Sequence, residues 1–101
     1  MFARIIKSYR DIVAVCDEDL LGKKFYEGNF QLDIKESFFN GKDSLELNEE
    51  KLVEFLKQMS VEDATFNIVG ENSIKSAIKA GIISENQVRK ISGTPFTIVL
   101  L

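Results

Sequence analysis

A chain of 101 residues has room for one domain, so we expect residues 1–101 to form a single compact unit. Hydrophobic residues make up 45% of the chain and charged residues 29%, a balance that excludes a disordered protein. The single cysteine, Cys16, cannot form an internal disulfide, so we expect a reducing, cytoplasmic setting. No run of 18 apolar residues and no secretory leader pattern is present, so we expect neither membrane spanning nor secretion.

The net charge of −3 is unevenly distributed along the chain. Residues 1–42 are neutral, whereas seven acidic and two basic side chains give residues 43–63 a net charge of −5. Residues 64–101 carry four basic and two acidic side chains, a net charge of +2. A polyanionic partner would therefore avoid the middle segment and prefer the C-terminal third.

The first third of the chain predicts strands and a short helical turn. Phe2–Ser8 and Asp11–Cys16 are rich in β-branched residues and predict a hairpin. Asp17–Gly22 predicts a short turn of helix that Asp17 caps. In Phe30–Ile34 apolar and polar residues alternate, which predicts a half-buried strand.

The middle of the chain contains the clearest helix signal. Asn40-Gly41 is a strong turn dipeptide, and Asn48 is a suitable N-cap. The residues after this cap predict one amphipathic helix, because apolar side chains recur at helical spacing. They are Leu52, Phe55, Leu56 and Met59. Ala64–Val69 then predicts a strand.

The last third predicts a helix followed by two strands. The helix spans about Glu71–Ala80, and Gly81 ends it in a left-handed conformation. Val88–Ile91 predicts a strand, and a turn is expected at Ser92–Pro95. Phe96–Leu101 is apolar on consecutive residues, so we expect it to lie inside the sheet with both faces covered.

These elements predict the fold class, because strands outnumber helices and do not alternate strictly with them. We expect an α+β fold, a single two-layer domain. Its sheet would be mostly antiparallel or mixed, with about five to six strands and two main helices on one face. The order of the strands stays open.

The stretch from the predicted strand into the second helix raises the question of an anion site. Backbone amides near Gly70, Asn72 and Ser73 would stand at the positive end of the helix. Glu71 would compete with an anion for that position, and a phosphate-binding loop needs further glycines or a Gly-Lys-Ser/Thr ending. We therefore favour packing of a helix on a sheet over anion binding.

The sequence lacks the usual residues of catalytic and metal sites. It contains no histidine, which removes the commonest general base and metal ligand. Cys16 precedes three carboxylates that would raise the pKa of its thiol, so we expect a buried apolar role for it. Asp17, Glu18 and Asp19 are adjacent on a helical turn and point in different directions, which favours capping and solvation over metal binding. We expect no metal, no cofactor and no enzymatic activity.

Two groups of residues are candidates for contact with a partner. Phe38 and Phe39 stand beside a turn, where one exposed ring could anchor a partner. We favour the alternative that one packs under the sheet and the other covers the hairpin. The helix from Glu71 would place Ile74, Ala77 and Ile78 inward and its polar residues, Ser76 included, outward. The basic candidates are Lys23, Lys24, Lys75, Lys79, Arg89 and Lys90.

Several segments together resemble a known family. They are CDEDLLGK (16–23), EG (27–28), ESFFNG (36–41), NIVGENSIKSAIKAGII (67–83) and GTPFTIVLL (93–101). In this order they are similar to the archaeal domain of unknown function family 424. The resemblance implies a compact α/β domain with no established activity, and a setting beside translation and ribosome-related genes. Family members commonly have Tyr where Phe39 stands, so a hydroxyl role would be lost here.

Three hypotheses follow. The leading one is a non-enzymatic binding module of the archaeal cytoplasm that acts with the translation machinery through RNA or a ribosome-associated protein. The second is a small ligand-binding protein or enzyme with a site near Gly70–Ser73 and Cys16–Asp19. The third is a homodimer that pairs through an exposed edge strand.

Overall fold

The computed structural model describes residues 1–100 as one main sheet, a separate two-stranded hairpin and three α-helices. The strands are β1 (Phe2–Ile6), β2 (Asp11–Cys16), β3 (Lys24–Glu27), β4 (Phe30–Asp33), β5 (Leu45–Glu46), β6 (Ala64–Val69), β7 (Arg89–Ile91) and β8 (Thr94–Leu100). The helices are α1 (Glu36–Phe39), α2 (Glu49–Met59) and α3 (Glu71–Lys79), with 3-10 turns η1 (Glu18–Leu20) and η2 (Glu85–Gln87).

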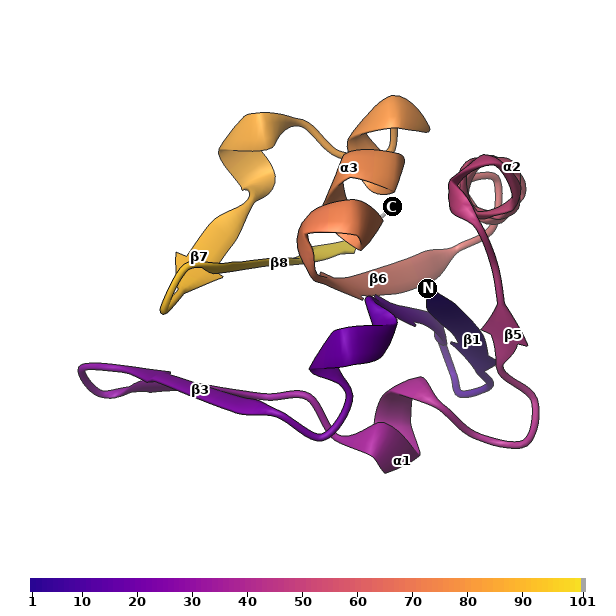
Figure 1. Cartoon of the computed structure of the whole chain (residues 1–101). Helices are drawn as coiled ribbons and strands as arrows, with labels where there is room; N and C mark the ends of the chain where they lie inside the picture. The colour runs from indigo at the N-terminus through magenta and orange to yellow at the C-terminus, as the bar shows by residue number, and fades with distance from the viewer. Residues whose placement is uncertain (101) are drawn as a thin grey trace.

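The main sheet has six strands in the order β5-β1-β2-β6-β8-β7. Its central pair, β2 and β6, is parallel, and its other neighbours are antiparallel. Helices α2 and α3 cover one face, while α1 and the β3–β4 hairpin lie on the other (Figure 1). The expected α+β fold with a mixed sheet and two main helices on one face is confirmed.

The larger core lies between the sheet and the two helices. Successive strand residues point to opposite faces, so Val13, Phe66 and Val99 lie side by side under the helices. They pack against Leu52 and Leu56 of α2 and against the apolar side of α3. Asn48 caps α2 as expected, because its Oδ1 accepts a hydrogen bond from the Lys51 amide at 2.9 Å.

A second, smaller core lies on the opposite face of the sheet. Ala14 and Cys16 of β2 and Val69 of β6 pack there against Ile34 and Phe39. Arg4 fixes α1 to β1, because its Nη1 donates to the backbone oxygens of Ser37 and Phe38 at 2.8 and 3.1 Å. The packing of one Phe under the sheet was the favoured alternative for Phe38 and Phe39, but the layer itself was not predicted, since β3 and α1 carry no strong periodic pattern of their own.

The C-terminal strand differs from its prediction. β8 does lie inside the sheet, between β6 and β7, but its Ile98 and Leu100 are 66% and 68% exposed. The hairpin and α1 reach only part of this face, so the expectation that both faces are covered is wrong. Leu101 lies outside the described residues. The turn before β8 is also tighter than expected, because only Ser92 and Gly93 adopt positive φ angles, of 50° and 80°.

Helix α3 begins at the predicted residue and ends one residue earlier than predicted, and it has a wider buried face. Ala80 is its C-cap, and Gly81 follows with φ of 79°, as expected. Ser76 was expected on the exposed side, yet it is fully buried and donates from Oγ to the Asn72 carbonyl at 2.9 Å. Helix α2 packs beside α3, and Met1 also reaches this side of the helix, with its Sδ 3.9 Å from Ser76 Oγ. Within residues 1–100, no helix has the length and apolar character needed to cross a bilayer.

Candidate functional site

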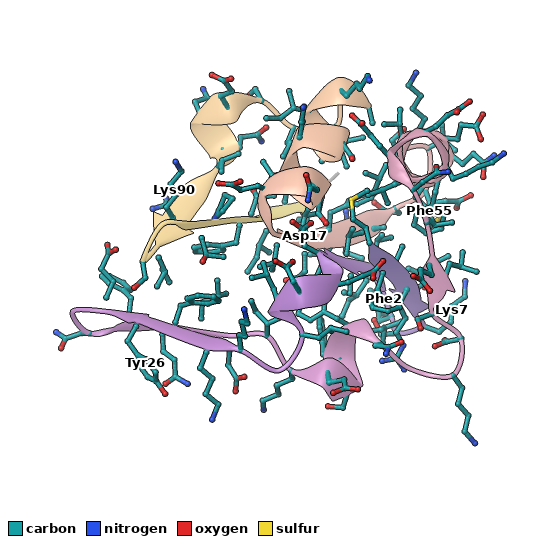
Figure 2. All side chains as sticks on the ribbon, viewed as in Figure 1. Phe2, Lys7, Asp17, Tyr26, Phe55 and Lys90 are labelled. Atoms are coloured by element: carbon teal, nitrogen blue, oxygen red, sulfur yellow. The ribbon has the colours of Figure 1, made fainter. Side chains whose placement is uncertain are left out.

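The positive end of α3 is occupied by a carboxylate from the same chain. Asp17 follows β2 directly and is only 5% exposed. Its Oδ1 accepts hydrogen bonds from the Ser73 amide at 2.8 Å and from Ser73 Oγ at 2.6 Å. Its Oδ2 accepts one from the Asn72 amide at 3.1 Å. Figure 2 labels Asp17 next to the first turn of α3. The amides that an anion would use therefore already donate to Asp17.

The backbone at Gly70 allows this close approach. Gly70 has φ of 109°, a conformation that side chains with a Cβ rarely adopt. A Cβ at this position would lie 2.4 Å from Asp17 Cγ. The glycine before α3 therefore serves to seat the Asp17 carboxylate on the helix.

The role of Asp17 differs from the expected one. Asp17 precedes η1, as predicted, but its side chain makes no capping hydrogen bond there. It caps α3 instead, a helix that begins more than 50 residues later in the chain. Glu71, the expected competitor for an anion, is exposed at the rim of this region.

The thiol of Cys16 is buried next to this carboxylate. Burial is the main cause that raises its pKa to about 12, and the negative charge of Asp17 adds to the effect. A raised pKa of the thiol was expected from the neighbouring carboxylates, but burial is the larger cause. At neutral pH the side chain is a protonated thiol and packs in the smaller core.

The two segments of the alternative small-ligand site do meet in space. Asp17, Asp19 and Glu71 line a hollow of about 220 Å³ at the start of α3. Asp17 is already hydrogen-bonded to the helix amides. Across residues 1–100, no group of acidic or cysteine side chains is arranged to hold a metal ion.

The six basic candidates do not form one positive patch. Lys23 and Lys24 lie at the base of the β3–β4 hairpin, and Lys79 pairs with Glu49 of α2 at 3.5 Å. Lys79 also faces Glu50 and Glu54 across a shallow hollow. Only Lys75 and Lys90 come together at one recess. Arg89, beside Lys90 in β7, alternates to the other face of the sheet.

The recess that joins Lys75 and Lys90 is named here the α3–β7 groove. It has a volume of about 500 Å³ and lies between α3, η2 and β7. Its apolar lining consists of Ile74, Ile78, Val88 and Pro95, and its charged lining consists of Glu71, Lys75, Glu85 and Lys90. Lys75 and Lys90 are recognisable as basic candidates in the sequence, but their common groove is not, because their approach depends on the order of the strands.

Phe38 and Phe39 lie in α1, and their surroundings are those of a core. Phe39 is 5% exposed, and Phe38 is half-buried. Their rings meet edge to face with centroids 5.0 Å apart, and both pack in the smaller core. Neither ring stands free on a loop, because α1 lies against the sheet.

The exposed aromatic residues lie elsewhere: Tyr9 is fully exposed in the turn between β1 and β2, and two others lie on the β3–β4 hairpin. Tyr26 is 60% exposed and points away from the main sheet (Figure 2). Phe30 is 71% exposed near the hairpin tip. The alternation in Phe30–Ile34 had indicated a buried side for Phe30, but the strand belongs to a projecting hairpin. Glu27-Gly28 and the aromatic residues around it are the signal that could have identified the hairpin.

A second recess, the hairpin groove, lies between this hairpin and the sheet. It has a volume of about 280 Å³, and Leu32, Phe96 and Ile98 are among its lining residues. The hairpin tip is held to the sheet by Ser92, whose amide donates to Glu27 Oε1 at 2.9 Å. Ser92 Oγ also donates to the Tyr26 carbonyl.

Comparisons with known proteins agree with this fold and assign no activity. A family model described as "Protein of unknown function (DUF424)" matches residues 6–101. No curated protein matches the chain. A crystal structure of an uncharacterized conserved protein from Methanopyrus kandleri is similar, with 24% identity and a TM-score of 0.82. The similarity covers 98% of this chain and 89% of that chain, and it shows a shared fold.

Proposed function

The chain belongs to the DUF424 family of proteins of unknown function, and we propose that it is a non-enzymatic binding module that holds a protein of the translation machinery. The translation setting and a cytoplasmic location rest on the family resemblance and on the single cysteine. The choice of a protein partner rests on the surface described next.

The observation that carries the proposal is an exposed apolar band on the sheet face opposite α2 and α3. We define the apolar band by Phe30, Leu32, Phe96, Ile98 and Leu100. Leu32, Phe96 and Ile98 line the hairpin groove. Phe30 lies on the same face of β4 as Leu32, and Leu100 lies on the same face of β8 as Ile98, so they extend the band beyond the groove. Phe30, Ile98 and Leu100 are exposed, whereas Leu32 and Phe96 are half-buried against the smaller core. Exposed apolar side chains that gather at a groove are typical of a contact surface.

The charges near the basic candidates favour a protein over RNA. Carboxylates accompany the lysines of α3, as Glu49 does for Lys79. A polyanion needs a continuous basic surface, and each nearby carboxylate would repel its phosphates. The residues of the apolar band are suited to contacts with apolar side chains of another protein.

The same arrangement supports a role in binding rather than catalysis. The chain has no histidine, and the thiol of Cys16 is buried with a raised pKa. The Asp17 carboxylate already accepts three hydrogen bonds from α3. A catalytic group must be able to reach a substrate. Cys16 and Asp17 instead make contacts within the domain and stabilise its fold.

The proposal is tested by co-sedimentation of tagged protein with ribosomes from the source cells. Ile98→Glu and Leu100→Glu place a charge in the apolar band, and Val61→Glu is a matched control because Val61 is 83% exposed outside the band. Loss of one buried apolar contact of ~2 kcal/mol corresponds to about a thirtyfold weaker binding. We expect this loss in the band variants and normal binding in the control.

Equal binding by wild type and both band variants would refute the proposal. If nuclease treatment abolished co-sedimentation and binding also weakened steeply at high salt, the partner would be RNA instead. A doubled mass in light scattering that Ile98→Glu returns to the monomer value would show that a second copy of the chain occupies the band.

A further inference from the structure

The α3–β7 groove lies on the helix side of the sheet, away from the apolar band, and supports an inference that goes beyond the proposed function. Ile74 and Pro95 are buried in its floor, and Ile78 and Val88 are half-buried there. Its volume of about 500 Å³ is enough for a large side chain and its flanking backbone. The floor is therefore suited to an apolar anchor.

The charged residues at this groove lack partners within the described chain. The structure records six ion pairs among residues 1–100, and none includes Glu71, Lys75, Glu85 or Lys90. By contrast, Lys79, one turn further along α3, does pair with Glu49. Two carboxylates and two ammonium groups around an apolar floor can form ion pairs with a ligand that carries both signs of charge.

The edge of the sheet next to the groove favours an extended ligand. β7 is the last strand of the sheet, and among residues 1–100 no strand pairs with its outer side. A free strand edge offers backbone donors and acceptors to an extended peptide. Glu71 and Pro95 also line the hollow at the start of α3, so the groove continues beyond its floor. An elongated ligand fits this shape better than a compact one.

We propose that the α3–β7 groove binds an extended peptide segment of another protein. The segment places a bulky apolar side chain on the floor between Ile78 and Val88 and carries an acidic and a basic side chain beside it. The acidic side chain pairs with Lys75 or Lys90, and the basic one with Glu71 or Glu85. Alternate residues of an extended segment share one side, so the apolar anchor and a charged side chain can both point into the groove.

The test is selection of a display library of linear peptides on the whole immobilised protein, followed by fluorescence anisotropy of the enriched peptides. We expect these peptides to share one bulky apolar residue with flanking charges of both signs. Lys75→Glu and Lys90→Glu should each weaken binding about fivefold to tenfold, since an attraction becomes a repulsion. Replacing the acidic residue of the peptide by lysine should restore binding to one of these variants.

Lys57→Glu is the matched control, because Lys57 is an exposed lysine of α2 outside the groove. Failure to enrich any peptide would overturn the inference, as would equal binding to the Lys57 and Lys75 variants. The inference would also be overturned if only acidic peptides were enriched and their binding depended strongly on salt. Loss of peptide binding in Ile98→Glu, with the lysine variants unaffected, would assign the peptide to the apolar band and leave the proposed function intact.

Discussion

Asp17 links the two halves of the domain through its side chain. Its carboxylate neutralises the positive end of α3 and satisfies two amides that have no partner within the helix. Ser73 Oγ donates a third hydrogen bond to the same group, and Gly70 leaves the space that the carboxylate fills. Asp17 is therefore a structural residue. It directly precedes η1 in the sequence, but this position does not reveal that its side chain caps α3.

The first prediction concerns this cap. Asp17→Ala should lower the free energy of unfolding by about 1–3 kcal/mol, because three hydrogen-bond donors lose a charged acceptor. Asp19→Ala, an exposed neighbour, should change it by less than about 0.5 kcal/mol. Urea denaturation measures both values. Equal effects of the two substitutions would show that the cap contributes nothing.

The second prediction concerns Cys16 and pH. Its pKa is raised from 9.0 to about 12 in the folded protein, so the unfolded chain releases the thiol proton first as pH rises. This contribution to stability is complete below pH 9 and is lost as pH rises toward 12. The stability of wild type should therefore fall more steeply than that of Cys16→Ala above pH 9, as denaturation across this range would show. If the stability of the two proteins decreased in parallel above pH 9, the predicted effect of the thiol would be contradicted.

At the scale of elements, the regular helices and the hairpin differ in what determines them. α2 and α3 carry a helical spacing of apolar residues and their own end signals, such as Asn48 and Gly81. The β3–β4 hairpin buries only part of one face and depends on the sheet for support. Its tip is held by Glu27 and Ser92.

The third prediction follows from that contact. Glu27→Ala removes the acceptor of the Ser92 amide, so the hairpin should open more often while the main sheet stays folded. Hydrogen exchange of amides in Lys24–Asp33 should become faster, with β2 and β6 unchanged. Asn29→Ala at the same tip is the control. Unchanged exchange in the Glu27 variant would show that this contact does not hold the hairpin.

At the scale of the whole molecule, one face of the sheet is covered and the other is partly open. The helices bury Phe66 and its neighbours completely, whereas Ile98 on the opposite face is 66% exposed. Because the burial of apolar surface is what stabilises the fold, an exposed isoleucine contributes less to folding than the buried Phe66.

The fourth prediction separates these two roles. Phe66→Ala should lower the free energy of unfolding by about 3–5 kcal/mol, because it leaves a cavity in the main core. Ile98→Thr retains a β-branched side chain and should change it by less than about 1 kcal/mol while weakening partner binding. Denaturation and the co-sedimentation assay measure the two effects. A strong loss of stability in Ile98→Thr would identify it as a core residue.

The grouping of the candidate residues in space was harder to predict than the fold. Lys75 and Lys90 were identified from their charge, but the groove between them forms only when α3 and β7 are placed against β8. Phe38 and Phe39 were candidates because adjacent rings rarely share one core. Their helix lies on a small second core that no local pattern indicates.

The sequence by itself determined the elements whose signals are local, because periodicity and end residues act within a few positions. The tertiary structure decided which distant groups meet. Cys16 and Val69 are partners in the parallel pair of β2 and β6, so the next residues, Asp17 and Gly70, become neighbours at one edge. That parallel pairing is stabilised by the burial of both strands, which no short stretch of sequence encodes.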